Sequence, residues 1–399
     1  MKKRIFVFVV VGQKEHIDEL NLSIRTLKHF TSYEIIVVTD LARNESGIEH
    51  GNILDVSTPE SMTNHQAAIY LKTGLHRFLD MSHEYCYLDG DVLAVRKNVD
   101  DVFNHFIAPI IFCTDHCRLQ EFSEAAIHST FDPDILKKRE VLYSLFDTIN
   151  QKRRRKRSPI KTFFERFIQF ILFRLSIVIV TALTMMKGTE IKKHKSKSAN
   201  QQRKFQYNEQ IRNTFVRLNE KIYRNPSAPV YYFLREGFFH DRVNFRWTDA
   251  RGNIILLEKS DYLADRIRQK FNVDVKEKNW QHWNGGVFLF NSESVEFMEN
   301  WHQWTLEIFK DMNWQVRDQG TLVATVWKFN LEHHPTLPIE FNFIADYHHP
   351  TMKYLGNLTF GFAKKRIIFR PVFLHIYHHW GDTEWAVWKD VKHFLNTMN

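Results

Sequence analysis

Two aspartates at the end of an apolar run constrain this chain more than any other feature. Residues 85–95 are rich in aromatic, aliphatic and β-branched side chains, as in a buried strand, but Asp89 and Asp91 interrupt them. A continuing strand would direct the two carboxylates to opposite faces, so we expect the strand to end here, with Gly90 permitting the turn. Two carboxylates meeting at that point suit a hard cation, Mn²⁺ or Mg²⁺. A solvated turn at the end of the strand could show the same Asp-Gly-Asp spacing, so other segments must decide between a turn and a metal site.

The neighbouring segments predict an α/β architecture. Apolar strand-like runs alternate with a segment of helical spacing in the order 5–11, 18–30 and 34–40. Strand, helix and strand at this spacing form a right-handed βαβ unit. Its ligand edge is expected near Val11, Gly12 and Asp40. An amphipathic helix over 63–79 precedes the Asp89 strand, so we predict a Rossmann-like, doubly wound layer.

Charge and cysteine content limit the partners and the compartment. The 399-residue chain has a net charge of +9, but residues 151–197 hold 14 basic and two acidic residues, a net +12 that leaves −3 for the remainder. The basic character therefore belongs to one segment, and a nucleic-acid partner is not indicated. Three cysteines provide no disulfide framework, which favours a reducing, cytoplasmic compartment.

The middle of the chain predicts an insertion. Residues 118–226 interrupt the α/β pattern and are expected to be largely helical, between a nucleotide-binding half at 1–117 and a sugar- and acceptor-binding half at 227–399. Within the segment 163–187 of the insertion, residues 167–186 have the length of a membrane span but carry Arg174 at the centre. We expect this segment to lie on the inner face of a membrane, with the basic residues of 151–197 on anionic headgroups. A buried helix with a basic linker is the alternative.

Five motifs in sequence order resemble the GT-A-fold nucleotide-sugar glycosyltransferases, in the style of the glycosyltransferase family 8-like group. They are the aspartate pair with its preceding strand, the Asn284-Gly285-Gly286 loop, the Asp318-Gln319 pair, the turn at 338–342 and His375. The resemblance implies a GT-A fold with a mixed central sheet. It also implies metal-dependent transfer of a hexose from a nucleotide-diphosphate sugar, with UDP as the first choice, to a hydroxyl of a glycan or lipid-linked acceptor.

The resemblance assigns a metal site. It implies that Asp89, Asp91 and His375 hold Mn²⁺ or Mg²⁺, which would grip the diphosphate of the donor. Two carboxylates and an imidazole suit Mn²⁺ on chemical grounds as well. Because the chain has 21 histidines, His378 and His379 remain alternatives for the third ligand.

The resemblance also assigns the donor site and the reacting groups. Asn284, Gly285 and Gly286 would form a wall of the donor-sugar pocket, since glycines allow close approach to the backbone. Asp318 and Gln319 would lie beside the reacting sugar or the acceptor, where an acid could act as a base or stabilise a cationic transition state. The remaining expected nucleotide-binding positions are Val11, Gly12, Asp40, Lys72 and Gly90.

Two departures and two rival functions remain open. The insertion makes the separation between Asp91 and Asn284 longer than a compact GT-A core needs. The chain after His375 also lacks the glycine-lysine-proline-tryptophan sequence of many family 8 members, so whether the transfer retains the configuration at the sugar's anomeric carbon is open. A sugar-nucleotide nucleotidyltransferase would need a glycine-rich, arginine-containing loop after the first strand, and residues 11–15 do not supply it. A non-catalytic membrane- or polyanion-binding protein would use the basic insertion but leaves Asp89 and Asp91 unexplained.

Overall fold

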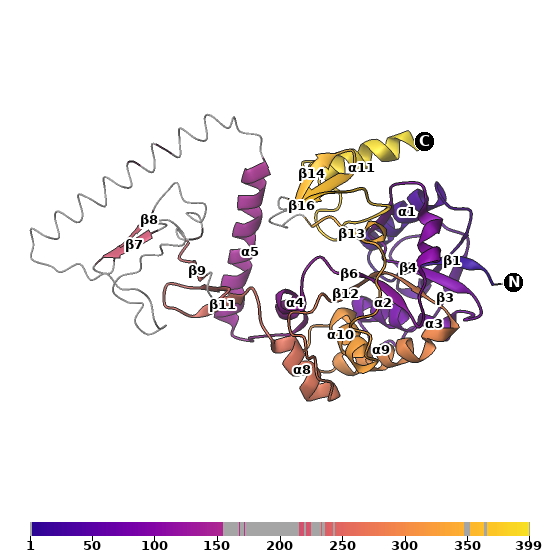
Figure 1. The fold of residues 1–399 in the computed structure, drawn as a ribbon, viewed down its shortest axis with the longest axis horizontal. Helices are drawn as coiled ribbons and strands as arrows, with labels where there is room; N and C mark the ends of the chain where they lie inside the picture. Colours follow the sequence, from indigo (N-terminus) through magenta and orange to yellow (C-terminus); the bar gives the residue numbers. More distant parts are fainter. Residues whose placement is uncertain are drawn as a thin grey trace, which may run out of the picture. The chain divides into compact units, whose positions relative to one another are not determined.

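The computed structural model describes most of the chain as two compact units. The described residues are 2–154, 167, 171, 215–218, 221–224, 233, 236–241, 244–346, 352–362 and 365–398. One unit combines residues 1–129 with 259–399, and the other comprises residues 130–258 (Figure 1).

The first unit is built on a mixed six-stranded sheet. Its strands are β1 (Arg4–Val10), β2 (Glu34–Thr39), β3 (Ile53–Asp55), β4 (Glu84–Leu88), β6 (Ile111–Thr114) and β12 (Trp283–Phe290), in the order β3-β2-β1-β4-β12-β6. The first four strands of that order are parallel, whereas β12 runs antiparallel to both β4 and β6. The expected α/β class, with a doubly wound and mixed central sheet, is confirmed.

Alternation along β1 explains why helices cover both faces of this sheet. Phe6 and Phe8 pack with α1 (Lys14–Lys28), while Val7 and Val9 face the opposite side. The helices on that opposite side are α2 (Asn64–Thr73), α3 (Leu75–Phe78), α9 (Val295–Ile308) and α10 (Asp318–Lys328). Because β1 is buried on both faces, it reads in the sequence as a continuous apolar run.

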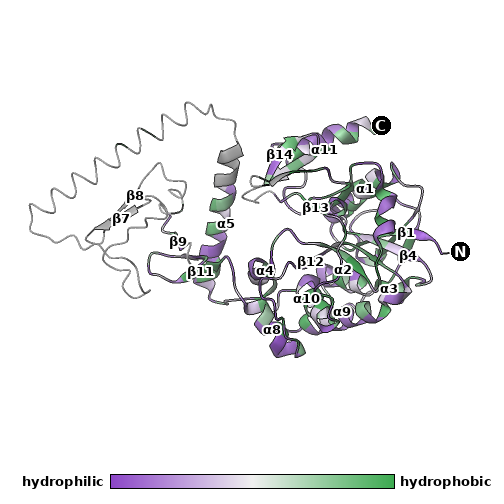
Figure 2. Cartoon of the chain, viewed as in Figure 1, coloured by the Kyte–Doolittle hydropathy of each residue, from purple (hydrophilic) through white to green (hydrophobic). Residues whose placement is uncertain are grey.

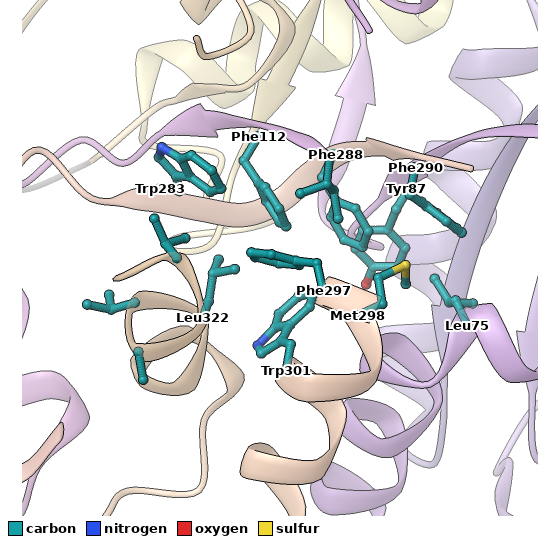
Figure 3. Packing of buried hydrophobic residues seen from close by; sticks show 14 of the residues in the cluster. Leu75, Tyr87, Phe112, Trp283, Phe288, Phe290, Phe297, Met298, Trp301 and Leu322 are labelled. Atoms are coloured by element: carbon teal, nitrogen blue, oxygen red, sulfur yellow. The ribbon is translucent and has the colours of Figure 1, made fainter. Parts of the chain in front are cut away.

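Aromatic rings fill the space between the sheet and α9. Phe288 of β12 stacks on Tyr87 of β4 and on Phe112 of β6, with ring centroids 4.8 Å apart in both pairs. Figure 3 shows these rings facing Phe297 and Trp301 of α9. Offset ring pairs of this kind add to the stabilisation from burial, by about 1 kcal/mol each. The aromatic residues of β12 therefore anchor the strand that carries the Asn284 loop.

A second set of strands in the same unit positions the end of the chain. The three-stranded sheet β13-β17-β5 consists of β5 (Val92–Ala94), β13 (Phe343–Ile344) and β17 (Phe373–His375). Beside it, β14 (Met352–Gly356), β15 (Thr359–Phe362) and β16 (Lys365–Phe369) form an antiparallel sheet that shares a core with α11 (Ala386–Thr397). Helix α11 carries both hydrophobic and hydrophilic residues (Figure 2), and its buried ones are Val387, Trp388, Val391 and Leu395.

The helices α4 (Leu119–Ala126) and α8 (Tyr262–Phe271) join the two sequence segments of the first unit. The hydroxyl of Ser123 in α4 accepts a hydrogen bond from the backbone N–H of Leu263 at 2.9 Å, and it lies 2.8 Å from the Ser260 hydroxyl. This packing places the boundaries between the units at 129/130 and 258/259. The sequence predicted boundaries at 117/118 and 226/227.

The second unit contains one long helix and short antiparallel strands among its described residues. These are α5 (Pro133–Arg154), β7 (Phe215–Leu218), β8 (Lys221–Arg224), β9 (Phe239–Asp241), β10 (Arg246–Thr248) and β11 (Ile254–Leu257). Leu142 of α5 packs with Trp247 and Ile255 in a small core. The segment expected at a membrane, 163–187, lies outside the described residues except for Phe167 and Ile171. Within the described part of the chain, every helix is too short or too polar to cross a bilayer.

A buried histidine in the first unit predicts a pH-dependent stability. His302 of α9 is fully buried, and its Nδ1 lies 2.8 Å from the Thr73 hydroxyl. That hydroxyl donates to the Ile69 carbonyl, so it accepts a hydrogen bond from His302 Nδ1–H. Burial, with the nearby Arg77 charge, lowers the pKa of His302 from 6.5 to about 4.

We therefore expect His302 to destabilise the fold as the pH falls. Below pH 6.5 the His302 side chain becomes protonated in the unfolded chain, whereas in the folded chain it stays neutral down to about pH 4. Acidification through this range therefore favours the unfolded chain, and the contribution of His302 to stability is complete only above pH 6.5. The free energy of unfolding should fall by about 2 kcal/mol from this group between pH 7 and pH 5. Urea denaturation of His302→Asn, which keeps a donor for Thr73, should show a correspondingly shallower pH dependence. An unchanged dependence would contradict this origin.

Candidate active site

The strand ends of the central sheet collect the polar residues of the site at one edge. Because β1, β2, β4 and β6 point the same way, Gly12, Asp40, Asp89 and Asp115 all follow carboxyl ends at that edge. Strand β12 runs in the opposite direction and starts there, which brings Asn284 to the same edge.

Asp89, Asp91 and His375 converge on one point. Strand β4 stops at Leu88, and the chain turns so that the Val92 N–H donates to the Asp89 carbonyl at 3.1 Å. Strand β5 then pairs antiparallel with β17, which sets His375 opposite Val92. His375 Nε2 lies 3.3 Å from Asp91 Oδ1, and one ligand atom from each of the three residues lies within 4.8 Å of the others.

The charges of the three residues fit a divalent cation. Burial, together with the charge of Asp91, raises the pKa of Asp89, although Lys72 acts in the opposite direction. Burial alone would also raise the pKa of Asp91, but His375 beside it holds that pKa below the usual value. Two half-buried carboxylates with one imidazole form an oxygen- and nitrogen-rich donor set that suits Mn²⁺. A cation here would offset the repulsion between Asp89 and Asp91.

Lys72 of α2 connects the aspartate pair to the start of α10. Its Nζ lies 3.1 Å from Asp89 Oδ1 and 3.0 Å from Asp318 Oδ2, and its side chain is only 12% exposed. Burial would lower the pKa of Lys72, but the carboxylates of Asp318 and Asp89 outweigh it and raise that pKa. Lys72 is therefore a fixed positive charge at the site, held between two carboxylates.

The Asn284-Gly285-Gly286 segment lies within β12, at a register shift in its pairing with β6. Asn284 Oδ1 accepts from the Gly286 N–H at 2.8 Å, and Asn284 Nδ2 donates to Asp115 Oδ2 at 2.9 Å. The Asn284 side chain therefore holds the Asn284-Gly285-Gly286 segment in its conformation through hydrogen bonds to Gly286 and Asp115. Cβ atoms are absent where space is short, since one on Gly286 would lie 2.5 Å from His375 Cε1.

Helix α10 begins with Asp318 and Gln319, next to the Asn284-Gly285-Gly286 segment. Gln319 Oε1 accepts from the Gly285 N–H at 3.0 Å, and its Nε2 donates to the Trp283 carbonyl. The Asp318 carbonyl accepts from Trp301 Nε1 at 3.0 Å, which ties this helix start to α9. Both residues therefore contact other predicted site residues, Asp318 through Lys72 and Gln319 through Gly285.

Three of the residues expected to bind the nucleotide, Val11, Gly12 and Asp40, are buried or hydrogen-bonded to other parts of the fold. Asp40 is 4% exposed, and its Oδ2 accepts from the Thr58 N–H at 2.8 Å and hydroxyl at 2.6 Å and from Arg43 at 3.3 Å. Val11 is also buried. Gly12 has φ +99°, and its N–H donates to Asn44 Oδ1 at 3.0 Å.

The turn glycine of the aspartate pair is likewise fixed by its surroundings. The Gly90 carbonyl accepts from the Ser23 hydroxyl at 2.6 Å, and a Cβ there would lie 3.7 Å from Leu20 Cβ. Gly90 therefore holds the turn of the aspartate pair against α1. Its role in the structure is carried by its backbone carbonyl, which accepts from Ser23.

The site includes residues to which the sequence interpretation gave no role. Asp115, directly after β6, accepts from Asn284 and lies 2.9 Å from His116 Nδ1. Asp115 is buried, and although burial opposes it, the charges of His282 and His116 hold its pKa well below the usual range. Asn342, at the turn singled out in the sequence, lies between Asn284 and His375. An acid directly after a strand was a visible signal for Asp115, whereas the contacts of Asn342 had none.

Comparisons of the whole chain with known proteins find glycosyltransferase structures, all at low similarity. No protein-family model matches the sequence, and no curated protein matches it. Among solved structures, the apo structure of the bifunctional glycosyltransferase WbbM aligns with all of this chain and 50% of its own, at 10% identity and a TM-score of 0.41. This chain therefore spans half the length of that protein.

Two further structures carry related descriptions. The apo form of mouse xyloside xylosyltransferase 1 aligns over 86% of this chain and 88% of its own, at 9% identity and a TM-score of 0.35. The apo form of glycosyltransferase GlyE from Streptococcus pneumoniae TIGR4 aligns over 28% of this chain and 29% of its own, at 15% identity and a TM-score of 0.21.

Proposed function

We propose that this protein is a metal-dependent glycosyltransferase of the GT-A type. It would transfer a hexose from a nucleotide-diphosphate sugar, with UDP as the first choice, to an acceptor hydroxyl. The observation that carries the proposal is the convergence of Asp89, Asp91 and His375 at the strand-end edge where an α/β sheet binds ligands. The glycine segment beside them lacks side chains, so its backbone packs directly against His375 and Gln319 at the same edge.

The residues around this point have distinct proposed roles. Asp89, Asp91 and His375 would hold Mn²⁺ or Mg²⁺, which supplies positive charge to stabilise the departing nucleotide diphosphate. Lys72 adds a fixed ammonium to the same region, 3.1 Å from Asp89. Gln319 holds the Gly285 backbone in place, so Gly285 and Gly286 can form the wall against the donor sugar.

Asp318 is the proposed reacting-side carboxylate. Its Oδ2 lies 3.0 Å from Lys72 Nζ, which also lies 3.1 Å from Asp89 Oδ1, so one ammonium group contacts both acids. An acid in this place could accept the proton of the acceptor hydroxyl or stabilise the positive charge that develops on the sugar. We propose a glycan or a lipid-linked saccharide as the acceptor.

We also propose that the protein acts at the cytoplasmic face of a membrane. The support comes from the sequence of residues 151–197, which has a net charge of +12 and contains the apolar stretch 167–186. Both features favour contact with a membrane that carries anionic headgroups. Co-sedimentation with vesicles containing phosphatidylglycerol, compared with phosphatidylcholine alone, tests this part separately. Equal recovery with both vesicle types would contradict it.

A donor screen tests the catalytic proposal. The protein is incubated with UDP-, GDP- and ADP-hexoses and Mn²⁺, and the released nucleoside diphosphate is measured with and without a mixture of saccharide acceptors. We expect release from one nucleotide class, stopped by EDTA and restored by Mn²⁺. Salt-sensitive vesicle binding without consumption of any donor would favour a non-catalytic membrane-binding protein instead.

A further inference from the structure

Asn342 forms a buried bridge between the metal-binding histidine and the donor loop. It follows the short helix η6 (Ile339–Phe341) and is 1% exposed. Asn342 Oδ1 lies 2.9 Å from His375 Nδ1, and Asn342 Nδ2 donates to Asn284 Oδ1 at 2.8 Å. One side chain therefore contacts residues that are 58 and 33 positions away in the sequence.

The direction of each hydrogen bond in this bridge follows from fixed donors and acceptors. The Gly286 N–H can only donate, so the Asn284 atom 2.8 Å away is the amide oxygen. Asn284 then presents its NH₂ group to Asp115 Oδ2, which accepts. The atom of Asn342 that faces Asn284 Oδ1 must in turn be its NH₂ group, so the oxygen of Asn342 faces His375.

This orientation decides which nitrogen of His375 can bind a metal. An amide oxygen only accepts, so His375 Nδ1 carries the hydrogen. Nε2 is then the nitrogen that faces Asp91 Oδ1, 3.3 Å away, and the one that would bind a cation there. Partners that hold the second nitrogen of a metal-binding histidine set its tautomer and ring orientation and commonly change metal affinity.

We infer that Asn342 is a positioning residue that sets the His375 tautomer and holds the Asn284 loop at the same time. The inference rests on the proposed function, because it assumes that His375 binds a cation and that the loop binds the donor. The two contacts are tightly coupled in space, since a Cβ on Gly286 would lie 2.8 Å from His375 Nδ1. A shift of the imidazole would therefore displace the loop, and a shift of the loop would displace the imidazole.

Two substitutions separate the two contacts. Asn342→Leu has a similar size but neither hydrogen bond. Asn342→Asp keeps an acceptor for His375 Nδ1 and places a carboxylate oxygen against Asn284 Oδ1. Affinity for Mn²⁺ is measured without nucleotide, from the electron paramagnetic resonance signal of free Mn²⁺, and affinity for the UDP-hexose donor is measured by calorimetry at saturating Mn²⁺.

We expect the two variants to behave differently. Asn342→Leu should weaken Mn²⁺ binding by roughly 10- to 100-fold. Asn342→Asp should retain wild-type Mn²⁺ affinity within about threefold, because a carboxylate partner also holds Nδ1–H, while donor affinity falls roughly tenfold from repulsion at the loop. Asn291→Ala is the matched control, since Asn291 is equally buried at 1% and accepts from the Glu293 N–H outside the site. It should lower thermal stability and leave Mn²⁺ affinity unchanged.

Each failure points to a different part of the argument. A wild-type protein that does not bind Mn²⁺ would reject the metal site and with it the proposed function. Wild-type binding together with equal Mn²⁺ affinity in Asn342→Leu would reject the positioning role alone. If Asn342→Leu is insoluble, Asn342→Asp decides alone, because loss of both affinities or of neither would overturn the inference.

Discussion

Replacing Asp91 with alanine is expected to lower Mn²⁺ affinity by on the order of 100-fold or more. Asp91 supplies one of only two carboxylates in the candidate metal site and is the one that pairs with His375 at 3.3 Å. Removing one member of a close, partly desolvated charge pair commonly costs about 2–5 kcal/mol, and each 1.4 kcal/mol is tenfold in affinity. Metal-dependent donor turnover should fall with the metal affinity.

A matched substitution separates this effect from a general loss of charge. Asp101→Ala removes an exposed aspartate in η2 (Val99–His105), remote in the fold from the strand-end edge, and should leave Mn²⁺ affinity within about twofold. Isothermal titration of Mn²⁺ into both variants and the wild type makes the comparison. Equal affinities in wild type and Asp91→Ala would remove Asp91 from the metal site.

Replacing Gly286 with alanine is expected to disrupt the metal site by steric contact. The new Cβ would lie 2.5 Å from His375 Cε1 and 2.9 Å from Asn284 Oδ1, closer than side-chain carbons approach other atoms. His375 is buried in the β13-β17-β5 sheet and has little room to yield. We expect a loss of roughly 1–3 kcal/mol in stability and at least about a tenfold loss of Mn²⁺ affinity.

The neighbouring glycine provides the comparison for this prediction. A Cβ on Gly285 would meet Gln319 Oε1 at 3.3 Å and Lys72 Nζ at 3.4 Å, which are milder contacts that a small side-chain shift relieves. Gly285→Ala should therefore keep Mn²⁺ affinity near the wild-type value. Metal titration and thermal unfolding of the two variants side by side test the difference, and equal Mn²⁺ affinity in both would show that Gly286 does not confine His375.

The sequence predicted the parts of this fold that depend on local pattern. Strand β1 is buried on both faces and therefore appears as an apolar run, and β4 ends at Leu88, directly before Asp89, as the two acids indicated. The structure brings His375 to Asp91, where His378 and His379 had also been considered. The pairing of β17 with β5 makes this choice, and strand pairing across almost 300 residues leaves no local signal.

The sequence could not predict which polar side chains are already engaged by the fold. Asp40 follows a strand just as Asp89 does, but Thr58 and Arg43 occupy its carboxylate. The role of Asn342 depends on hydrogen bonds to two distant segments. Such networks depend on the final packing of several elements, whereas alternation and strand ends are properties of one segment.

Calorimetric titration of UDP into the wild-type protein, with Mn²⁺ and then with EDTA, is the decisive test of the proposed function. We expect binding that requires Mn²⁺ and disappears in EDTA, because the diphosphate would be held through the cation at Asp89, Asp91 and His375. If neither UDP nor any other nucleoside diphosphate binds in the presence of Mn²⁺, the site is not a nucleotide-sugar site and the proposed glycosyltransferase function is wrong.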